Sequence, residues 1–320
     1  MPQFASTHVD ALLTGISVKY PLGLGQIAGT ILPKVSVSKE SGIYFKYDKG
    51  DQARIPFTKR QIRSESRSTT WRVSTDSYRC EEYALNDLID EREYQQADQP
   101  LDLQRDTLEN LQNLLVLDRE RRVKTLVTNP AVITKNITLA GTAQWRDAGA
   151  SGVTADPMFD VERASEAVRA DTGVRPNLAV FGMAAWLAFT KVTKIIDRIV
   201  TPGGAWGSPT ISTDVARTLF APYGITQVEV VDTVQNTGLL GGTDSFADIW
   251  GDEVLLAYVT PSPGIKKVSF GYTFVSRDWQ VRREVITRQH SDWIEPSYVA
   301  DEKLVAPDVA YLILDVSDGT

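Results

Sequence analysis

Side chains that carry most catalytic and metal chemistry are scarce in this sequence. The 320 residues include one cysteine, Cys80, which excludes a disulfide within one chain and a metal site built from several cysteines. The only histidines are His8, in a Gly- and Pro-rich arm, and His290, at a polar strand end, and neither lies in a metal-binding spacing. We therefore expect no catalytic site, no metal and no cofactor, and interpret Cys80 as a small, partly buried apolar residue.

Long apolar runs and an excess of positive charge are also missing. No segment approaches the roughly 20 apolar residues needed to span a bilayer, and residues 1–10 lack the basic start and apolar core of a signal peptide. The formal net charge is −7, whereas proteins that grip phosphates usually carry a basic excess. We therefore expect a protein made in the cytosol that contacts nucleic acid only non-specifically.

Nucleotide-binding and hydrolase motifs are not found either. Gly23, Gly25 and Gly29 are spaced GxGxxxG, one residue longer than the dinucleotide fingerprint, and Pro33 interrupts any helix that would follow. The sequence holds no GxxxxGK[ST] phosphate loop and no GxSxG elbow. Carboxylates are numerous, so a carboxylate-based α+β hydrolase stays open as an alternative.

Two adjoining blocks of opposite charge are the most unusual feature that is present. Residues 54–79 hold seven bases and two acids, a local charge of +5, in polar and β-prone sequence that predicts a long two-stranded excursion. Residues 81–102 hold one base and eight acids, a local charge of −7. Such a basic ribbon can fold back on its own acidic shoulder or reach the shoulder of a neighbouring copy. Because an isolated two-stranded ribbon is marginal in water, the neighbour would supply the missing support.

The remaining elements follow in a definite order. Apolar residues at helical spacing, ended by Asn129-Pro130, predict a long helix over 100–128. A second helix is expected between an Asp156 cap and Gly173, and the chain then alternates between short strands and helices before a strand-rich end. The fold class is therefore α+β.

This order of parts resembles the HK97-type major capsid proteins of tailed bacteriophages. Four passages are similar to phage coat proteins: LPKVSV at 32–37, GIYFKY at 42–47, PNLAVFG at 176–182 and KLVAPDVAY at 303–311. The resemblance implies a domain order that runs through an N-terminal arm (1–47), an extended loop (48–80), a peripheral domain (81–158) with its spine helix (100–128), an axial domain (159–265) and return strands to the peripheral domain (266–320).

The resemblance also implies a function. Hexamers and pentamers of the chain would tile an icosahedral shell around double-stranded DNA in the virion, assembled in the host cytoplasm. Because the arm begins almost at Met1, a separate scaffolding protein is expected, together with a portal and a decoration protein as further partners. The alternatives are an encapsulin-like nanocompartment shell and the carboxylate-based hydrolase.

Two sets of residues are expected to meet other subunits. The ribbon and the shoulder would form a subunit interface through Arg54, Lys59, Arg60, Arg63, Arg67, Trp71, Glu81, Glu82, Asp87, Asp90, Glu91 and Glu93. Two Gly-rich loops, at 201–210 and 238–244, would crowd the symmetry axes through Pro202, Gly203, Gly204, Trp206, Gly241 and Gly242.

Overall fold

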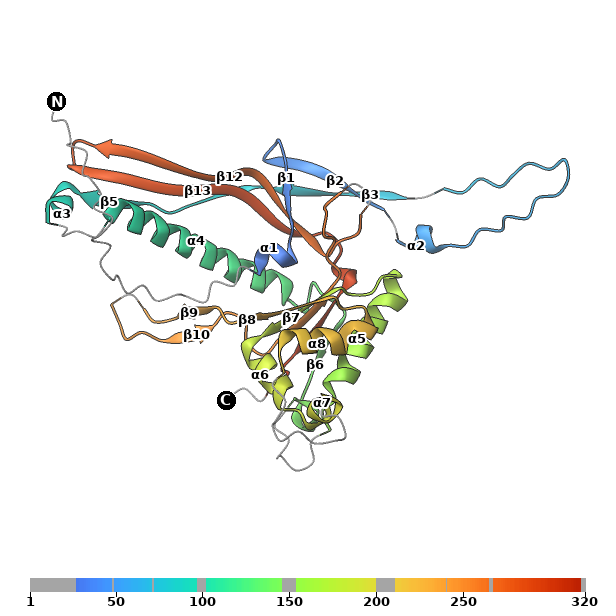
Figure 1. Cartoon of the computed structure of the whole chain (residues 1–320). Helices are drawn as coiled ribbons and strands as arrows, with labels where there is room; N and C mark the ends of the chain where they lie inside the picture. Colours follow the sequence, from blue (N-terminus) through green and yellow to red (C-terminus); the bar gives the residue numbers. More distant parts are fainter. Residues whose placement is uncertain are drawn as a thin grey trace.

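The chain folds into two joined bodies and one long projection. The computed structural model describes residues 27–47, 49–70, 72–96, 102–145, 154–199, 211–239, 241–264 and 267–317. A long hairpin lies along a long helix in the first body, an α/β unit forms the second, and a loop extends far beyond both (Figure 1).

The first body, which we call the peripheral body, is built on a five-stranded sheet. Its strands follow the order β1-β12-β13-β4, and β5 also pairs with β13. β12 and β13 form an antiparallel hairpin whose register shifts between Val275 and Arg277 and again before Gln280. The bounds are β1 (Lys34–Ser36), β4 (Glu81–Ala84), β5 (Asp87–Asp90), β12 (Gly271–Ile286) and β13 (Ser291–Leu304).

The helix α4 (Leu103–Val127) runs along this sheet and joins it to the second body. It begins after Asp102, whose side chain accepts a hydrogen bond from the Arg105 amide, as an N-cap residue does. Leu115 packs among sheet residues, whereas Val123 and Val127 belong to a core shared with the α/β unit. At about 1.5 Å per residue the helix is roughly 38 Å long. The helix predicted over 100–128 is confirmed with slightly shorter bounds.

The α/β unit has a second five-stranded sheet with both faces covered. Its strand order is β6-β14-β11-β7-β8. Alternate residues of β7 enter two different cores, Ala179 and Phe181 on one face, Leu178 and Val180 on the other. The bounds are β6 (Asn136–Thr138), β7 (Leu178–Gly182), β8 (Gln227–Val231), β11 (Val254–Ala257), β14 (Ala310–Leu314), α5 (Pro157–Thr172), α6 (Met183–Lys191), α7 (Thr193–Ile199) and α8 (Thr213–Phe220).

Smaller elements complete the described chain. They are α1 (Ala28–Ile31), α2 (Lys49–Ala53), α3 (Glu91–Gln96), a separate hairpin of β9 (Val234–Asn236) and β10 (Phe246–Asp248), and three 3-10 turns at Gly141–Ala143, Ala221–Tyr223 and Pro307–Val309. The helix expected after Asp156 is confirmed as α5, with Asp156 as its cap and Gly173 in the left-handed conformation (φ 77°) at its end.

Three expected boundaries differ from the structure. The last strand, β14, joins the sheet of the α/β unit and not the peripheral sheet. Its side chains are apolar on both faces of the strand, and both faces of this sheet are buried. The strand β6 joins the same sheet, although it falls within the expected peripheral domain. The strand β2 (Ser41–Tyr47), assigned to the arm, pairs with β3 (Val73–Arg79) and is therefore the first strand of the loop.

Gly182, where β7 meets α6, gives a test of packing in the α/β unit. A Cβ atom there would lie 2.0 Å from the Gly251 carbonyl oxygen, so the backbone must shift. We expect Gly182→Ala to lower the free energy of unfolding by about 1–3 kcal/mol. The matched control is Gly29→Ala in α1, where nothing lies within 4 Å. Urea unfolding followed by tryptophan fluorescence measures both, and equal stability of the two variants would contradict the packing argument.

Candidate assembly surface

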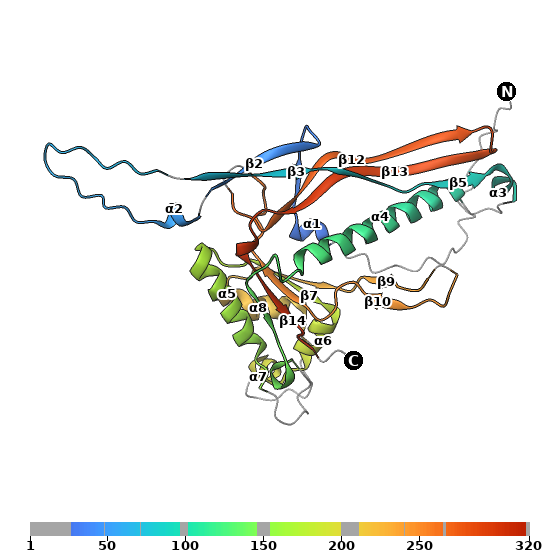
Figure 2. The same ribbon diagram turned by 180° about the vertical axis from the view of Figure 1, so that it is seen from behind.

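The projecting loop buries almost nothing against its own chain. Its stem is the β2–β3 ribbon, with seven paired residues on each strand, and beyond α2 the residues 54–70 form no regular structure. Ile55 is 94% exposed, Ile62 96% and Phe57 62%. Both views show the loop extending away from the two bodies (Figures 1 and 2). These apolar side chains are a feature that the sequence analysis missed, since it noted only the basic charge.

Four of the basic residues of the loop contact partners within the loop itself. Arg54 and Arg72 lie 3.7 and 3.2 Å from the Asp51 carboxylate, and hydrogen bonds from Arg72 hold the pKa of Asp51 below its ordinary value. The Arg60 Nε donates to the Ser64 carbonyl at 2.6 Å. The Arg67 guanidinium lies over the Phe57 ring at 5.2 Å. These contacts shape the tip, and all of its side chains from 53 to 70 stay exposed.

The stem is fastened to the peripheral sheet through Asp76 and a stack of rings. Asp76 accepts hydrogen bonds from the Tyr44 hydroxyl at 2.8 Å and the Lys303 ammonium at 2.9 Å. The Tyr78 ring stacks on Phe274 at 4.6 Å. Cys80 is 7% exposed and packs in the same small core, as expected of an apolar residue, and burial raises the pKa of its thiol.

Asp76 makes the fastening of the stem dependent on pH. The hydrogen bond from Lys303 lowers the pKa of Asp76 far below its usual value, although partial burial opposes the shift. The stabilisation is therefore present above the ordinary aspartate pKa and is lost as the pH falls through the depressed value. We expect Asp76→Asn to loosen the stem by about 1 kcal/mol at neutral pH. Hydrogen exchange of β2 and β3 measures this, with Asp214→Asn on exposed α8 as control, and unchanged protection would contradict it.

The acidic shoulder runs from the base of the stem to the far end of the peripheral sheet. It consists of β4, which follows β3 after one residue, and of β5 and α3, and Figure 1 places α3 at the end of the body away from the loop. Glu82 lies 3.7 Å from Arg277 and 3.5 Å from Arg282 of β12. The other expected acids are Glu81, Asp87, Glu91 and Glu93, which are exposed, and Asp90, which is half-buried. Leu85 and Leu88 between them are 38% and 45% exposed.

The loop tip at 54–70 therefore extends away from the shoulder of its own chain, and β5 and α3 lie at the other end of the body. This arrangement is against the fold-back alternative, and the interface with a neighbouring copy stays a prediction. Trp71 lies outside the described residues.

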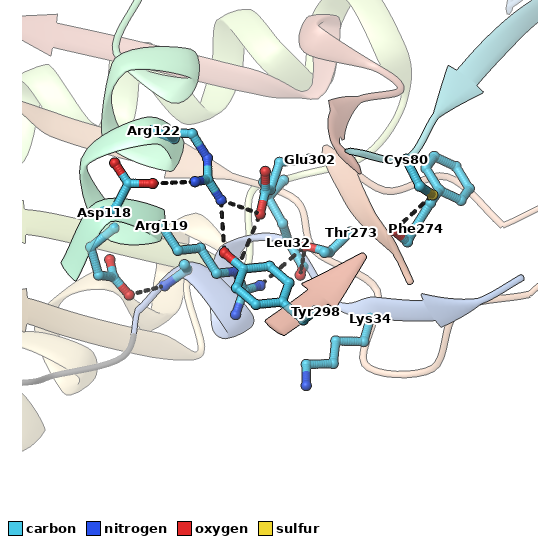
Figure 3. Close-up of polar contacts among 12 residues, drawn as sticks. Leu32, Lys34, Cys80, Asp118, Arg119, Arg122, Thr273, Phe274, Tyr298 and Glu302 are labelled. Carbon is cyan, nitrogen blue, oxygen red and sulfur yellow. Dashed lines mark hydrogen bonds and ion pairs between the residues drawn. The ribbon is translucent and has the colours of Figure 1, made fainter. Parts of the chain in front are cut away.

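A partly buried ionic cluster ties α4 to the sheet that carries both surfaces (Figure 3). Glu302 of β13, whose side chain is 7% exposed, lies 3.4 Å from both Arg119 and Arg122. Arg122 also pairs with Asp118, donates to the Tyr298 hydroxyl at 2.9 Å, and covers the Tyr83 ring at 3.6 Å. Burial lowers the pKa of Arg122, but Glu302 and Tyr298 outweigh it and raise the pKa above its ordinary value. The cluster fixes the helix relative to the sheet.

Of the two loops expected at symmetry axes, the one at 201–210, with Pro202, Gly203, Gly204 and Trp206, lies outside the described residues. Gly241 and Gly242 belong to the tip of the β9–β10 hairpin, which extends sideways below α4 (Figure 1). That these loops lie at symmetry axes stays a prediction.

Comparisons with known proteins support the capsid resemblance. No family model matches the chain. The major capsid protein of Burkholderia phage BcepMu is 26% identical over 318 residues, 97% of each chain. This chain is thus similar along nearly its whole length to a phage major capsid protein, which supports the resemblance to the HK97-type proteins. A phage-related protein from Bordetella bronchiseptica has the same fold with a TM-score of 0.67 and 23% identity, over 92% of this chain and 93% of that one.

The cyanophage P-SCSP1u capsid shares the fold at a TM-score of 0.58 and 10% identity, covering 88% of this chain and 85% of that one. The α+β prediction and the resemblance to HK97-type capsid proteins are therefore confirmed. In this chain, no three His, Cys, Asp or Glu side chains of the described ranges converge as they would around a metal ion. None of the helices in the described part is long and apolar enough to cross a membrane.

Proposed function

We propose that this capsid protein forms hexameric and pentameric rings that close into an icosahedral head shell around double-stranded DNA. The observation that carries the proposal is the loop at 54–70, which exposes Ile55, Phe57 and Ile62 and has no surface of the described part of the chain beneath it. A long, apolar, basic projection is costly to leave in water and is explained by a partner that covers it.

The partner that fits is the acidic shoulder of a neighbouring copy. The shoulder offers exposed Leu85 and Leu88 between carboxylates, whereas the loop offers three apolar side chains between arginines. Complementary charge would align the two surfaces, and the apolar contacts would supply most of the affinity. Because the loop tip and the β5–α3 part of the shoulder lie at opposite ends of the subunit, each copy can give its loop to one neighbour and receive a loop from another.

The role we propose is structural, without catalysis and without a cofactor. A separate scaffolding protein, a portal and a decoration protein are further proposed partners, and assembly would take place in the host cytoplasm. The net charge of −7 supports contact with packaged DNA that is loose and non-specific. The comparisons with known proteins do not favour the hydrolase alternative.

Sedimentation velocity of the purified protein tests this function. When the concentration of protein or crowding agent is raised, the monomer peak should shrink and peaks of rings and closed particles should appear. The reason is that many weak contacts act together in a closed assembly. A protein that stays monomeric under crowding and in the presence of a phage scaffolding protein would contradict it.

A further inference from the structure

Lys49, at the base of the loop, joins the loop to the α/β unit. It begins α2, the short helix that leads from the stem into the tip. Its ammonium donates to the Asp171 carboxylate at 2.7 Å and to the Asp308 carboxylate at 2.8 Å. Asp171 lies in the last turn of α5, and Asp308 lies in the 3-10 turn that precedes β14. Both views place α2 beside one end of α5 (Figures 1 and 2). One side chain therefore ties the loop to two segments that are far from it in the sequence.

The two carboxylates share a second lysine, which belongs to the α/β unit. Lys135, one residue before β6, donates to the Asp171 carboxylate at 2.6 Å and to the Asp308 carbonyl at 2.6 Å. Without Lys49 the group holds two acids and one base, a charge of −1, and with Lys49 it is neutral. Opposite charges at these distances stabilise each other, so the α/β unit has a place for one further cation and Lys49 fills it.

The pKa shifts agree with this geometry. Hydrogen bonds from Lys135 and Lys49 hold the pKa of Asp171 below its ordinary value. Burial lowers the pKa of Lys49, but the hydrogen bonds to Asp171 and Asp308 outweigh it and raise the pKa above its ordinary value. Lys49 and Asp171 are therefore both charged at neutral pH.

The contact is partly exposed, so it can open. The side chains of Lys49, Asp171 and Asp308 are 50%, 41% and 46% exposed. Ion pairs at this exposure contribute little one by one and are screened by salt, whereas several pairs that share groups act as a network. The stem is held separately on the peripheral sheet, where Lys303 donates to Asp76. When the Lys49 contact opens, the loop keeps its stem and can turn about it.

We infer that Lys49, Lys135, Asp171 and Asp308 form an ionic latch that sets the direction of the loop relative to the α/β unit. A closed latch holds the loop in one direction before a neighbouring copy is met, and an open latch lets it sweep a range of directions. A surface already held in its bound arrangement loses less conformational entropy on association. The use of the latch in assembly rests on the proposed shell function, but the latch itself belongs to the single subunit.

Distances between two spin labels in the unassembled subunit test the latch. The labels are attached to Ala53→Cys at the end of α2 and to Thr213→Cys on α8, both exposed, in a Cys80→Ala background. Pulsed electron paramagnetic resonance then gives the distribution of distances. Lys49→Ala should broaden this distribution, because α2 is no longer tied to the α/β unit. Lys49→Glu combined with Asp308→Lys exchanges the charges of one pair and should restore a narrow distribution.

A second exposed lysine supplies the matched control. Lys34→Ala removes the same charge and an ion pair with Asp278 at 3.5 Å, outside the loop, and should leave the distribution narrow. Salt at about 1 M, where screening acts over about 3 Å, should broaden the distribution of the protein with Lys49 intact. Equal distributions for Lys49→Ala and Lys34→Ala would overturn the latch, whether or not particles form.

The assembly threshold gives a second readout. Lys49→Ala should raise the protein concentration at which particles form by about threefold or more, because a freely turning loop loses more entropy on binding. Lys34→Ala should leave the threshold unchanged. A broadened distribution with an unchanged threshold for Lys49→Ala would overturn the role of the latch in assembly. Absence of particles in the wild type would contradict the shell function, while the distance measurement still decides the latch.

Discussion

Reversing three charges at the loop tip is expected to stop shell assembly. The variant Arg60→Glu, Arg63→Glu, Arg67→Glu places negative charges against the acidic shoulder of the neighbour. Like charges brought together in an interface lower the binding free energy by up to about several kcal/mol. We expect the yield of closed particles to fall at least about tenfold. The subunit should stay folded, because the tip is exposed and belongs to no core. Electron microscopy and circular dichroism of the same samples measure the two effects.

Two matched variants separate charge pairing from damage to the loop. Lysine at the same three positions keeps the charge, so these particles should form. Glu81→Lys, Asp87→Lys and Glu91→Lys on the shoulder should block assembly alone and restore it when combined with the reversed loop. If the reversed loop forms normal shells by itself, the loop does not bind the shoulder through charge.

Removing Glu302 is expected to have the largest effect on the stability of the subunit. Its carboxylate lies 3.4 Å from both Arg119 and Arg122 in the contact between α4 and β13. Glu302→Ala leaves two partly buried guanidinium groups without this partner, which typically costs about 3–5 kcal/mol. Because Arg122 keeps its pair with Asp118, we expect a value near the lower limit. Urea unfolding of the unassembled subunit measures the loss.

An exposed ion pair supplies the control for this prediction. Asp214 and Arg217 lie 3.1 Å apart on α8, with the Asp214 side chain 80% exposed, so Asp214→Asn should change stability by less than about 1 kcal/mol. A Glu302→Ala variant as stable as this control would show that the cluster does not hold the helix to the sheet.

The elements predicted best from the sequence carry local signals. The helix α5 has an acidic cap, a proline in its first turn and a left-handed glycine at its end, and each signal lies at the helix boundary that it marks. The long helix α4 shows its spacing over many turns, although its start falls at Leu103 because Asp102 is the residue that caps it. Local chemistry decides such boundaries, so one sequence is enough to find them.

Long-range pairing was predicted less well. The apolar strand β14 was recognised, but its neighbours in the sheet, β6 and β11, lie about 170 and 55 residues earlier in the chain. No feature of the local sequence indicates which distant strands will pair with it. The loop tip at 54–70 was expected to be stranded, yet pairing ends at Tyr47 and Val73. The exposed apolar residues of the tip were missed because exposure depends on what folds nearby.

Negative-stain electron microscopy of the purified protein tests the central claim most directly. The proposed function predicts closed shells, or rings whose class averages show five and six subunits, at concentrations where sedimentation finds large particles. Particles of the Arg60, Arg63 and Arg67 reversal on parallel grids should be rare. A monomer that forms neither rings nor shells, alone, under crowding or with a phage scaffolding protein, would contradict the claim that this chain builds a capsid.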